Sequence, residues 1–401
     1  MLVLESADRV GGRALSETSS LGSRVDLGGQ WIGHDHERLR SLALELGLTP
    51  YAMTSPRVAG IVDGGRRIRP FTPSVLTAAL ALGVVSALRI VPGSRVGRQA
   101  TVGSWLRRVP GHRSRRLLEA AVLISWTADP DQISVRTMFS LIRAQGGLVT
   151  MLSTTGGAQD SLLVEGVGTI AEQLADELGE RVRLGAKVES IVRDETGATL
   201  RTAAGDVRAT KVVISAPPPM ARHIAHEPPL PEDRASLEAG TFMGSVYKAI
   251  AVYERPFWRS HADAEMTILD RPGRAVFDSS PPDGPGHLCI LVGGSEAREL
   301  DQLEPGARRE LLLGPIAAVL GDEVLRPASW HEKSWHLDER AGGGYIALPL
   351  VDSEVGVPMP SVPVGPIHWA GAETAEDHPG YFDGAIESGQ RAAQEVLNAL
   401  V

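Results

Sequence analysis

The chain has 401 residues, which is enough for two domains. Hydrophobic residues make up 43% of it and charged residues 22%, a composition typical of globular rather than disordered or fibrous proteins. The formal net charge of −9 argues against a nucleic-acid binder, because such a protein needs a basic surface to neutralise phosphates. The lone cysteine, Cys289, excludes an internal disulfide and a cysteine-based zinc site, and it favours a reducing cytoplasm.

The first predicted elements are a short strand and two helices. Leu2–Leu4 is apolar and stops at Glu5, which predicts the end of a buried parallel strand and is too short for the apolar core of a signal peptide. A helix is expected over about Glu37–Leu46. The longest uncharged stretch, Pro70–Leu88, contains two prolines and a glycine. We expect a buried or interfacial helix there rather than a membrane span.

Arginine-rich helical stretches then alternate with apolar ones up to about residue 158, after which an α/β pattern returns. The later expected elements are a helix at Ile170–Leu178, strands at Val182–Leu184, Val188–Val192, Lys211–Ala216, Tyr247–Val252, His287–Gly293 and Ile367–Gly371, and a helix from about Asp383. The α/β signal therefore comes in three pieces. This predicts one dinucleotide-type domain over 1–56, 161–238 and 338–401, interrupted by a second domain over 57–160 and 239–337.

A Rossmann nucleotide site needs a glycine-rich βα turn for pyrophosphate, a second strand, and an acid at the end of that strand for ribose hydroxyls. Glu5 stands where the acid belongs. No GxGxxG motif precedes it, because only four residues do. We therefore expect a misassigned start or a truncated chain. Loss of the first βα unit would leave the sheet an unpaired edge and no helix dipole for pyrophosphate.

Four glycine-containing segments occur in an order and at a spacing that a set of unrelated turns would not be expected to have. They read DRVGGR at 8–13, DLGGQWIG at 26–33, WAGAET at 369–374 and GYFDGAIESG at 380–389. With them the chain resembles the flavin-dependent amine oxidases of the monoamine oxidase family, from Leu2 to about Val396. The resemblance implies an α/β fold in which an interrupted FAD-binding Rossmann-like domain, lacking its first βα unit, is joined to an α+β substrate domain.

The resemblance also assigns the cofactor residues. FAD would contact Glu5, Gly12, Arg13, Gly28, Gly29, Gln30, Trp31, Val188, Trp335, Glu373, Tyr381 and Phe382. Ala372 departs from the threonine that is common in the family, which removes one possible hydroxyl contact. Animal monoamine oxidases have a flavin-bonding cysteine at the position of Gly344. Glycine has no side chain to form such a bond, so non-covalent FAD is expected.

The predicted catalytic residues are Lys248, Tyr345 and Tyr381. In the family, the lysine holds a water against flavin N5, and two aromatic rings sandwich the substrate amine. A lysine within an apolar strand is unusual in any case, because burying an ammonium is costly. Gln159 corresponds to a glutamine at the edge of this aromatic cage. Gln159, Tyr345 and Tyr381 are thus the predicted substrate-binding residues.

The implied reaction takes a hydride equivalent from the carbon alpha to an amine, giving an imine, then aldehyde and ammonia, with hydrogen peroxide formed from oxygen. Two alternatives stay open. One is a flavin desaturase or protoporphyrinogen-type oxidase, and the other is a non-catalytic truncated homologue unable to hold FAD. The substrate also stays open among amines, polyamines and amino acids. Arg57, Arg136 and Arg143 are available to bind a carboxylate.

The remaining candidate site residues have simpler structural explanations. His34, Asp35 and His36, and the pair His331 and His336, lack further ligands, so no metal site is expected. The run Arg107–Arg116 is predicted to be a solvated helix face. We expect an amine and oxygen as partners, no nucleic acid and no stable membrane anchor, and a homodimer stays open. The chain ends without the C-terminal anchor helix of membrane-bound family members, so a soluble cytoplasmic enzyme is expected.

Overall fold

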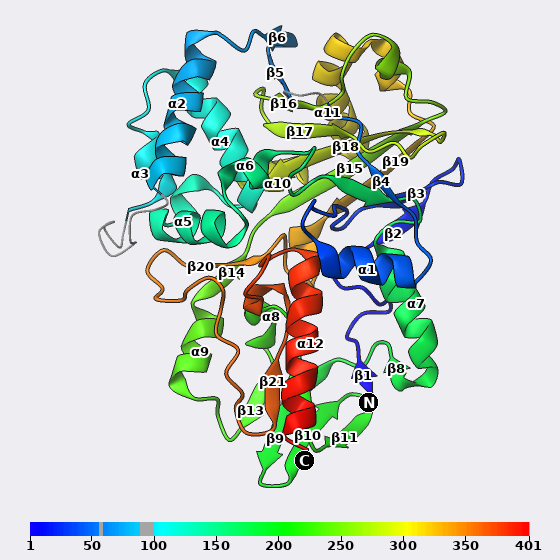
Figure 1. Ribbon diagram of the computed structural model, residues 1–401, viewed down its shortest axis with the longest axis vertical. Coiled ribbons are helices and arrows are strands. Elements are labelled where there is room, and N and C mark those ends of the chain that lie inside the picture. Colours follow the sequence, from blue (N-terminus) through cyan, green and yellow to red (C-terminus); the bar gives the residue numbers. More distant parts are fainter. Residues whose placement is uncertain (56–58, 89–99, 401) are drawn as a thin grey trace.

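The structure, a computed structural model, describes residues 1–55, 59–88 and 100–400. Its α-helices are α1 (Glu37–Glu45), α2 (Pro73–Leu88), α3 (Val102–Leu106), α4 (His112–Trp126), α5 (Val135–Ala144), α6 (Leu148–Leu152), α7 (Gly168–Leu178), α8 (Pro218–Ala221), α9 (Glu232–Ala239), α10 (Ser295–Leu300), α11 (Pro305–Leu320) and α12 (Phe382–Asn398). Figure 1 shows α2 to α6 gathered on one side of the upper half, while α12 runs from the middle of the molecule towards its lower end.

A seven-stranded sheet forms the core of the upper half (Figure 1). In spatial order its strands are β19 (Ser329–Ser334), β15 (Val246–Tyr253), β18 (Gly286–Gly293), β17 (Arg274–Asp278), β16 (Met266–Ile268), β5 (Gly60–Asp63) and β6 (Arg66–Ile68). The central strands β15 and β18 are antiparallel and buried along their whole length. Their β-branched and apolar residues suit a strand covered on both faces. Both strands are predicted correctly to within one residue.

The lower half contains a four-stranded sheet and two short parallel strand pairs. The sheet has the order β11 (Gly205–Ala209), β10 (Gly197–Thr202), β9 (Val188–Asp194) and β13 (Ala225–Glu227). One parallel pair joins β1 (Val3–Leu4) to β8 (Val182–Arg183), and the other joins β12 (Val212–Ile214) to β21 (Ile367–Trp369). Leu4 packs against the apolar cluster that β9, β10, β12 and β21 share. The predicted parallel strand before Glu5 is therefore confirmed.

Three further antiparallel strand pairs complete the fold, of which only the first is a hairpin. They are β2 (Ser16–Thr18) with β3 (Arg24–Asp26), β4 (Pro50–Ala52) with β7 (Ser161–Leu163), and β14 (Thr241–Met243) with β20 (Ala347–Pro349). The expected mixture of α/β and α+β elements is thus present. The exact domain limits stay a prediction.

The arginine run at 107–116 differs from the expected solvated face. Arg107 and Arg113 are exposed, but the guanidinium of Arg116 in α4 is buried and bonded to Glu296 at 2.8 Å. The prediction is wrong for Arg116 because a carboxylate 180 residues away, in α10, makes burial of that charge possible. Such a pairing is invisible in local sequence. Pro73–Leu88 does form the expected helix, and no described helix is long and apolar enough to cross a membrane.

The N-terminus of α12 is fixed against α1. Asp383 accepts hydrogen bonds from the backbone amide of Leu39 at 2.9 Å and from Arg38 at 3.2 Å. Its buried carboxylate therefore satisfies a buried amide donor in the first turn of α1. Because Tyr381 immediately precedes α12, this contact also fixes the place of one predicted cage ring.

Candidate active site

An ion pair between distant segments forms the frame of the site. Arg13 donates two hydrogen bonds to Glu373, at 2.7 and 3.1 Å, and a third to the Tyr345 carbonyl at 2.6 Å. Burial on its own would raise the pKa of Glu373, but the charge and hydrogen bonds of Arg13 outweigh burial and lower it. Glu373 is therefore ionised, and two segments predicted to bind the cofactor meet the backbone of the predicted substrate-binding Tyr345 at one guanidinium.

Glycines allow the segment 26–33 to pass close to its neighbours. A side chain at Gly28 would place its Cβ 2.1 Å from the Arg13 carbonyl oxygen, and one at Gly29 would meet the Phe382 ring at 2.6 Å. Gly12 adopts a positive φ of 55°, in the turn before Arg13. The backbone contacts between this segment, the Arg13 loop and the start of α12 consequently require glycine at these places.

Lys248 projects from β15 onto the same segment. Its ammonium donates to the Gly28 carbonyl at 2.8 Å and to the side-chain oxygen of Gln30. Only 2% of Lys248 is exposed. Burial lowers its pKa, although the nearby Cys289 and Asp26 oppose that shift. The structure therefore brings the predicted catalytic lysine to the predicted flavin segment, with a pKa that favours proton exchange more than that of a solvated lysine.

The two predicted cage tyrosines come from two different segments of the chain. Tyr345 follows the glycine turn at 342–344, and Tyr381 precedes α12. Burial raises the pKa of both phenols, and the field of Tyr381 adds to the shift at Tyr345. Both rings are neutral at physiological pH. The Tyr345 hydroxyl is buried and has no hydrogen-bond partner among the described residues.

Two predicted tryptophans line the neighbouring walls. The Trp31 ring meets Phe277 edge-on at 5.2 Å, and its indole N–H points to Met53 sulfur at 3.0 Å. The Lys248 ammonium lies 5.5 Å from the centre of the same ring. Trp335 is buried and donates to the Leu27 carbonyl at 2.7 Å. Trp335 therefore supports the segment 26–33 from outside, and Trp31 joins that segment to Met53 and Phe277.

Three other predicted residues, Gln159, Glu5 and Val188, make their contacts away from Lys248 and the two tyrosines. Gln159 donates to the Met151 carbonyl at 3.2 Å. Glu5 follows β1, and its Oε1 accepts a hydrogen bond from the Ala7 amide at 2.7 Å. Val188 begins β9 and packs against the lower apolar cluster. No contact joins these three residues to Lys248 or the tyrosines among the described residues, and their assigned roles stay predictions.

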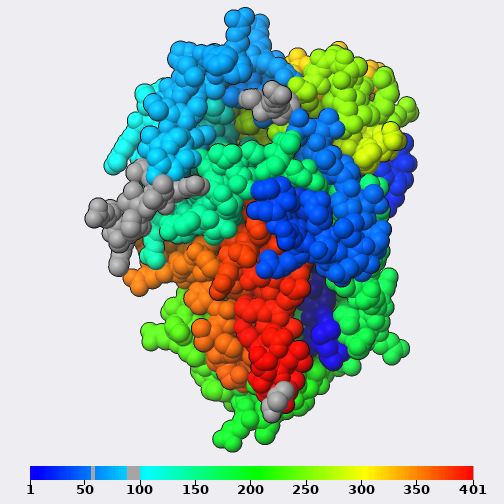
Figure 2. Space-filling model, in the orientation of Figure 1, coloured from blue at the N-terminus to red at the C-terminus, as the bar shows by residue number. Residues whose placement is uncertain are grey.

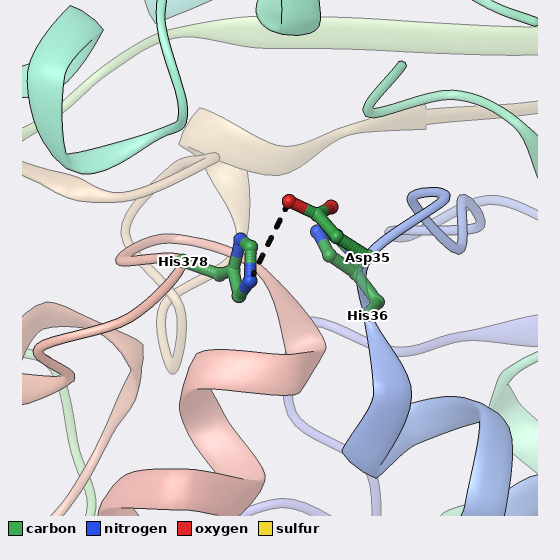
Figure 3. A group of neighbouring side chains, drawn as sticks. All are labelled: Asp35, His36 and His378. Atoms are coloured by element: carbon green, nitrogen blue, oxygen red, sulfur yellow. Dashed lines mark ion pairs between the residues drawn. The ribbon is translucent and has the colours of Figure 1, made fainter. Parts of the chain in front are cut away.

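The fold supplies a third neighbour to a pair of residues that seemed isolated in the sequence. Ligand atoms of Asp35, His36 and His378 lie within 4.8 Å of one another (Figure 3). His36 Nδ1 accepts the Gly33 amide hydrogen at 2.9 Å, and burial lowers the pKa of His36 to about 4. The neutral ring therefore has its proton on Nε2. In this arrangement its lone pair is already used, which disfavours metal binding by His36.

These histidines instead contact the aromatic cage. The His36 ring lies 4.7 Å from the His378 ring and 4.9 Å from the Tyr381 ring, at interplanar angles of 62° and 60°. Only 1% of His36 is exposed. The Gly33 amide thus fixes a ring that in turn packs on Tyr381. No sequence motif indicated this contact, because His378 lies more than 340 residues from His36.

Sequence reasoning also missed Cys289 and Asp26. Cys289 is fully buried in β18, and burial raises its pKa, while Lys248 and a hydrogen bond to Gln30 act in the opposite direction. Asp26 is buried, accepts the Val167 amide at 3.0 Å, and contributes to the field at Lys248. A lone cysteine and one acid in a glycine motif give no sequence signal for such roles.

Comparison with known proteins agrees with this geometry. The family model for flavin containing amine oxidoreductase matches residues 1–397. The putative flavin-containing monoamine oxidase AofH of Mycobacterium tuberculosis is 36% identical over all of this chain and 92% of the relative. The flavin-containing amine oxidase B of Sus scrofa is 32% identical over all of this chain and 82% of the relative.

Solved structures give the same result. Cyclohexylamine oxidase from Brevibacterium oxydans superimposes with a TM-score of 0.92 at 27% identity, covering all of this chain and 93% of that one. This bears out the predicted combination of an FAD-binding fold with a substrate-binding part, and it does not favour the desaturase alternative. The chain belongs to the family of flavin containing amine oxidoreductases.

Proposed function

We propose that this chain oxidises a primary amine at its alpha carbon, with FAD held non-covalently and oxygen as the final electron acceptor. The products are an imine, which water converts to an aldehyde and ammonia, and hydrogen peroxide. The observation that supports this most strongly is the buried Lys248, whose side chain is bonded to Gly28 and Gln30 of the predicted flavin segment. Removing an ammonium from water costs free energy, so a lysine buried at this position indicates a functional role.

The residues present fit a flavin. The side-chain nitrogen of Gln30 and the hydroxyl of Tyr345 are buried without partners among the described residues, and a polar ring system is the kind of group that could satisfy such atoms. The N-terminus of α12, which follows Tyr381, offers backbone amides to an anion. We assign Arg13 and Glu373 to fixing the segments that hold the cofactor. Because residue 344 is glycine, the cofactor has no side chain there to bond with.

When bound, FAD supplies the redox chemistry by accepting the hydride equivalent and passing electrons to oxygen. The protein's residues do the rest. Tyr345 and Tyr381 align an unprotonated amine between neutral aromatic faces, and Gln159 borders this cage. Lys248, with its lowered pKa, holds water and exchanges a proton at its amine nitrogen. Glu5 and Val188 serve the ribose and adenine ends, and Trp31 and Trp335 close the walls.

The positions of the described arginines support a substrate without an alpha carboxylate. Of the three arginines available for a carboxylate, Arg143 is exposed on α5, and Arg136 lines a separate pocket between α5 and residues 351–357. Arg57 lies outside the described residues. We therefore propose an amine without an alpha carboxylate.

The division into two domains with the limits predicted above, a cytoplasmic location and a possible homodimer are parts of the same proposal. The deciding experiment is the visible spectrum of the purified chain, followed by anaerobic titration with benzylamine, cyclohexylamine, putrescine and leucine. Flavin bands that bleach with an amine but not with leucine would support the proposal. A protein that stays colourless after addition of FAD would contradict it, and would favour a homologue unable to hold the cofactor.

A further inference from the structure

Helix α2 is apolar on both of its sides. Its inner face, with Ala78, Leu82 and Val85, packs into the core that it shares with α4 and α5. Its water-facing side repeats at helical spacing and also contains only apolar residues: Pro73, Leu76, Ala79, Leu80, Gly83, Val84 and Ala87. Soluble helices that contact a core on one face usually have a polar opposite face, so this surface is anomalous for a helix in water.

The exposure is large for the bulky members of this stripe. Leu80 is 71% exposed, Leu76 is 52% exposed, and Phe71, just before the helix, is 85% exposed. Figure 2 shows the helix, in light blue, on the outer edge of the molecule. The stripe is therefore a continuous apolar surface rather than a set of single exposed residues, which are common and need no explanation.

A basic segment precedes the stripe in the chain, at the N-terminal end of α2. Arg66, Arg67 and Arg69 lie on and just after β6, which leads into α2, and all three are exposed. Arg67 donates to the Asp263 carbonyl at 2.6 Å. Arg66 and Arg69 have no carboxylate partner among the described residues. From residue 65 to residue 88 the sequence contains no acidic residue, although the whole chain has a net charge of −9.

We propose that the α2 stripe, from Pro73 to Ala87, together with Phe71, rests on an anionic lipid surface with the helix parallel to the membrane plane. Apolar side chains beside cations are the two features that interfacial helices use. A second copy of the chain fits less well. A two-fold interface uses the same patch on both partners, so neither copy would offer these arginines an acid from within the patch.

Vesicle co-sedimentation of the full chain tests this proposal. The probes are phosphatidylcholine vesicles, and the same vesicles with phosphatidylglycerol as about a quarter of the lipid. The unmodified chain should bind the anionic vesicles, and raised salt should weaken the binding. The variant Leu76→Ser/Leu80→Ser should bind at least about tenfold less, because two leucine side chains lose their apolar contact. Arg66→Gln/Arg69→Gln should lose the preference for anionic lipid.

Leu44→Ser/Leu337→Ser is the matched control, since Leu44 and Leu337 are 60% and 65% exposed on other surfaces. It should bind vesicles like the unmodified chain. All of these positions are exposed, and the melting temperature of each variant verifies its fold. Two results would overturn the proposal. One is equal vesicle binding by the α2 variant and the control, and the other is a dimer in light scattering that only the α2 variant disrupts, without any vesicle binding by the parent.

Discussion

Arg13 and Glu373, 360 residues apart, form a two-pronged ion pair in which the carboxylate is 1% exposed and the guanidinium side chain 24%. The pair joins the first flavin segment to the turn before α12. Arginine suits this place because its planar fork matches both carboxylate oxygens. Losing one partner leaves a buried charge without compensation, which is costlier than losing both.

The first prediction follows from this pair. Arg13→Met should lower the free energy of unfolding by about 3–5 kcal/mol, because Glu373 stays buried and unpaired. Arg13→Met/Glu373→Leu should recover part of that loss. Urea unfolding at neutral pH provides the measurement. Arg24→Met is the control, since Arg24 pairs with the half-exposed Glu172 and should cost no more than about 1 kcal/mol. Equal losses for Arg13→Met and Arg24→Met would contradict the assignment.

The second prediction concerns Lys248. Lys248→Met should slow turnover by about 100-fold or more, because the site loses the group that exchanges protons. Its pKa is lowered, so the part of the pH profile that depends on this amine should lie below the range of an ordinary lysine, and the variant should lack it. Stopped-flow measurement should separate amine-dependent flavin reduction from reoxidation by oxygen.

Lys333 is the matched control for that experiment. It stands opposite Lys248 in the neighbouring strand β19, but it pairs with Asp338 at 2.7 Å and is partly exposed. Lys333→Met should leave both half-reactions unchanged. If Lys248→Met reduces and reoxidises the flavin at parental rates over the whole pH range, Lys248 has no part in the chemistry.

A third prediction distinguishes the rings of the cage from their hydroxyls. Tyr345→Phe should lower kcat/KM by less than about tenfold, because the ring is kept and only the buried hydroxyl that a bound flavin would satisfy is lost. Tyr345→Leu and Tyr381→Leu should lower kcat/KM by about 10- to 100-fold, since orientation between two aromatic faces is lost. Tyr253→Phe serves as the control. It removes a buried hydrogen bond to the Val324 carbonyl, so stability should fall while KM stays constant.

The sequence predicts which residues belong to the site better than it predicts which distant residues contact one another there. Lys248 is recognisable because it interrupts an apolar strand, and the glycine segments are recognisable because close approach of the backbone requires glycine. His378 beside His36, Glu296 beside Arg116, and Cys289 beside Lys248 leave none, because each contact depends on how distant elements pack. For the same reason the solvated face predicted for 107–116 is wrong at Arg116. A local sequence pattern indicates whether a residue is suited to burial or to solvent. The residue that it contacts is determined by the tertiary fold.

The fourth prediction concerns acid sensitivity. Burial lowers the pKa of His36 to about 4, below its ordinary value of 6.5, and the proximity of His378 adds to this shift. The folded state therefore resists a proton that the unfolded chain accepts. The resulting stabilisation is complete above pH 6.5 and is lost as the pH falls from 6.5 towards 4. A difference of this size corresponds to about 3 kcal/mol.

His36→Phe should remove this part of the pH dependence. It keeps a ring against Tyr381 but does not titrate, so the difference in unfolding free energy between pH 7 and pH 4.5 should shrink. His226 and His287 have similarly lowered pKa values of about 4 for reasons led by burial, so part of the dependence should remain. The exposed His112 provides the control variant, His112→Phe, which should follow the parent. If His36→Phe also follows the parent, protonation of His36 does not limit stability in acid, and its contact with Tyr381 serves packing alone.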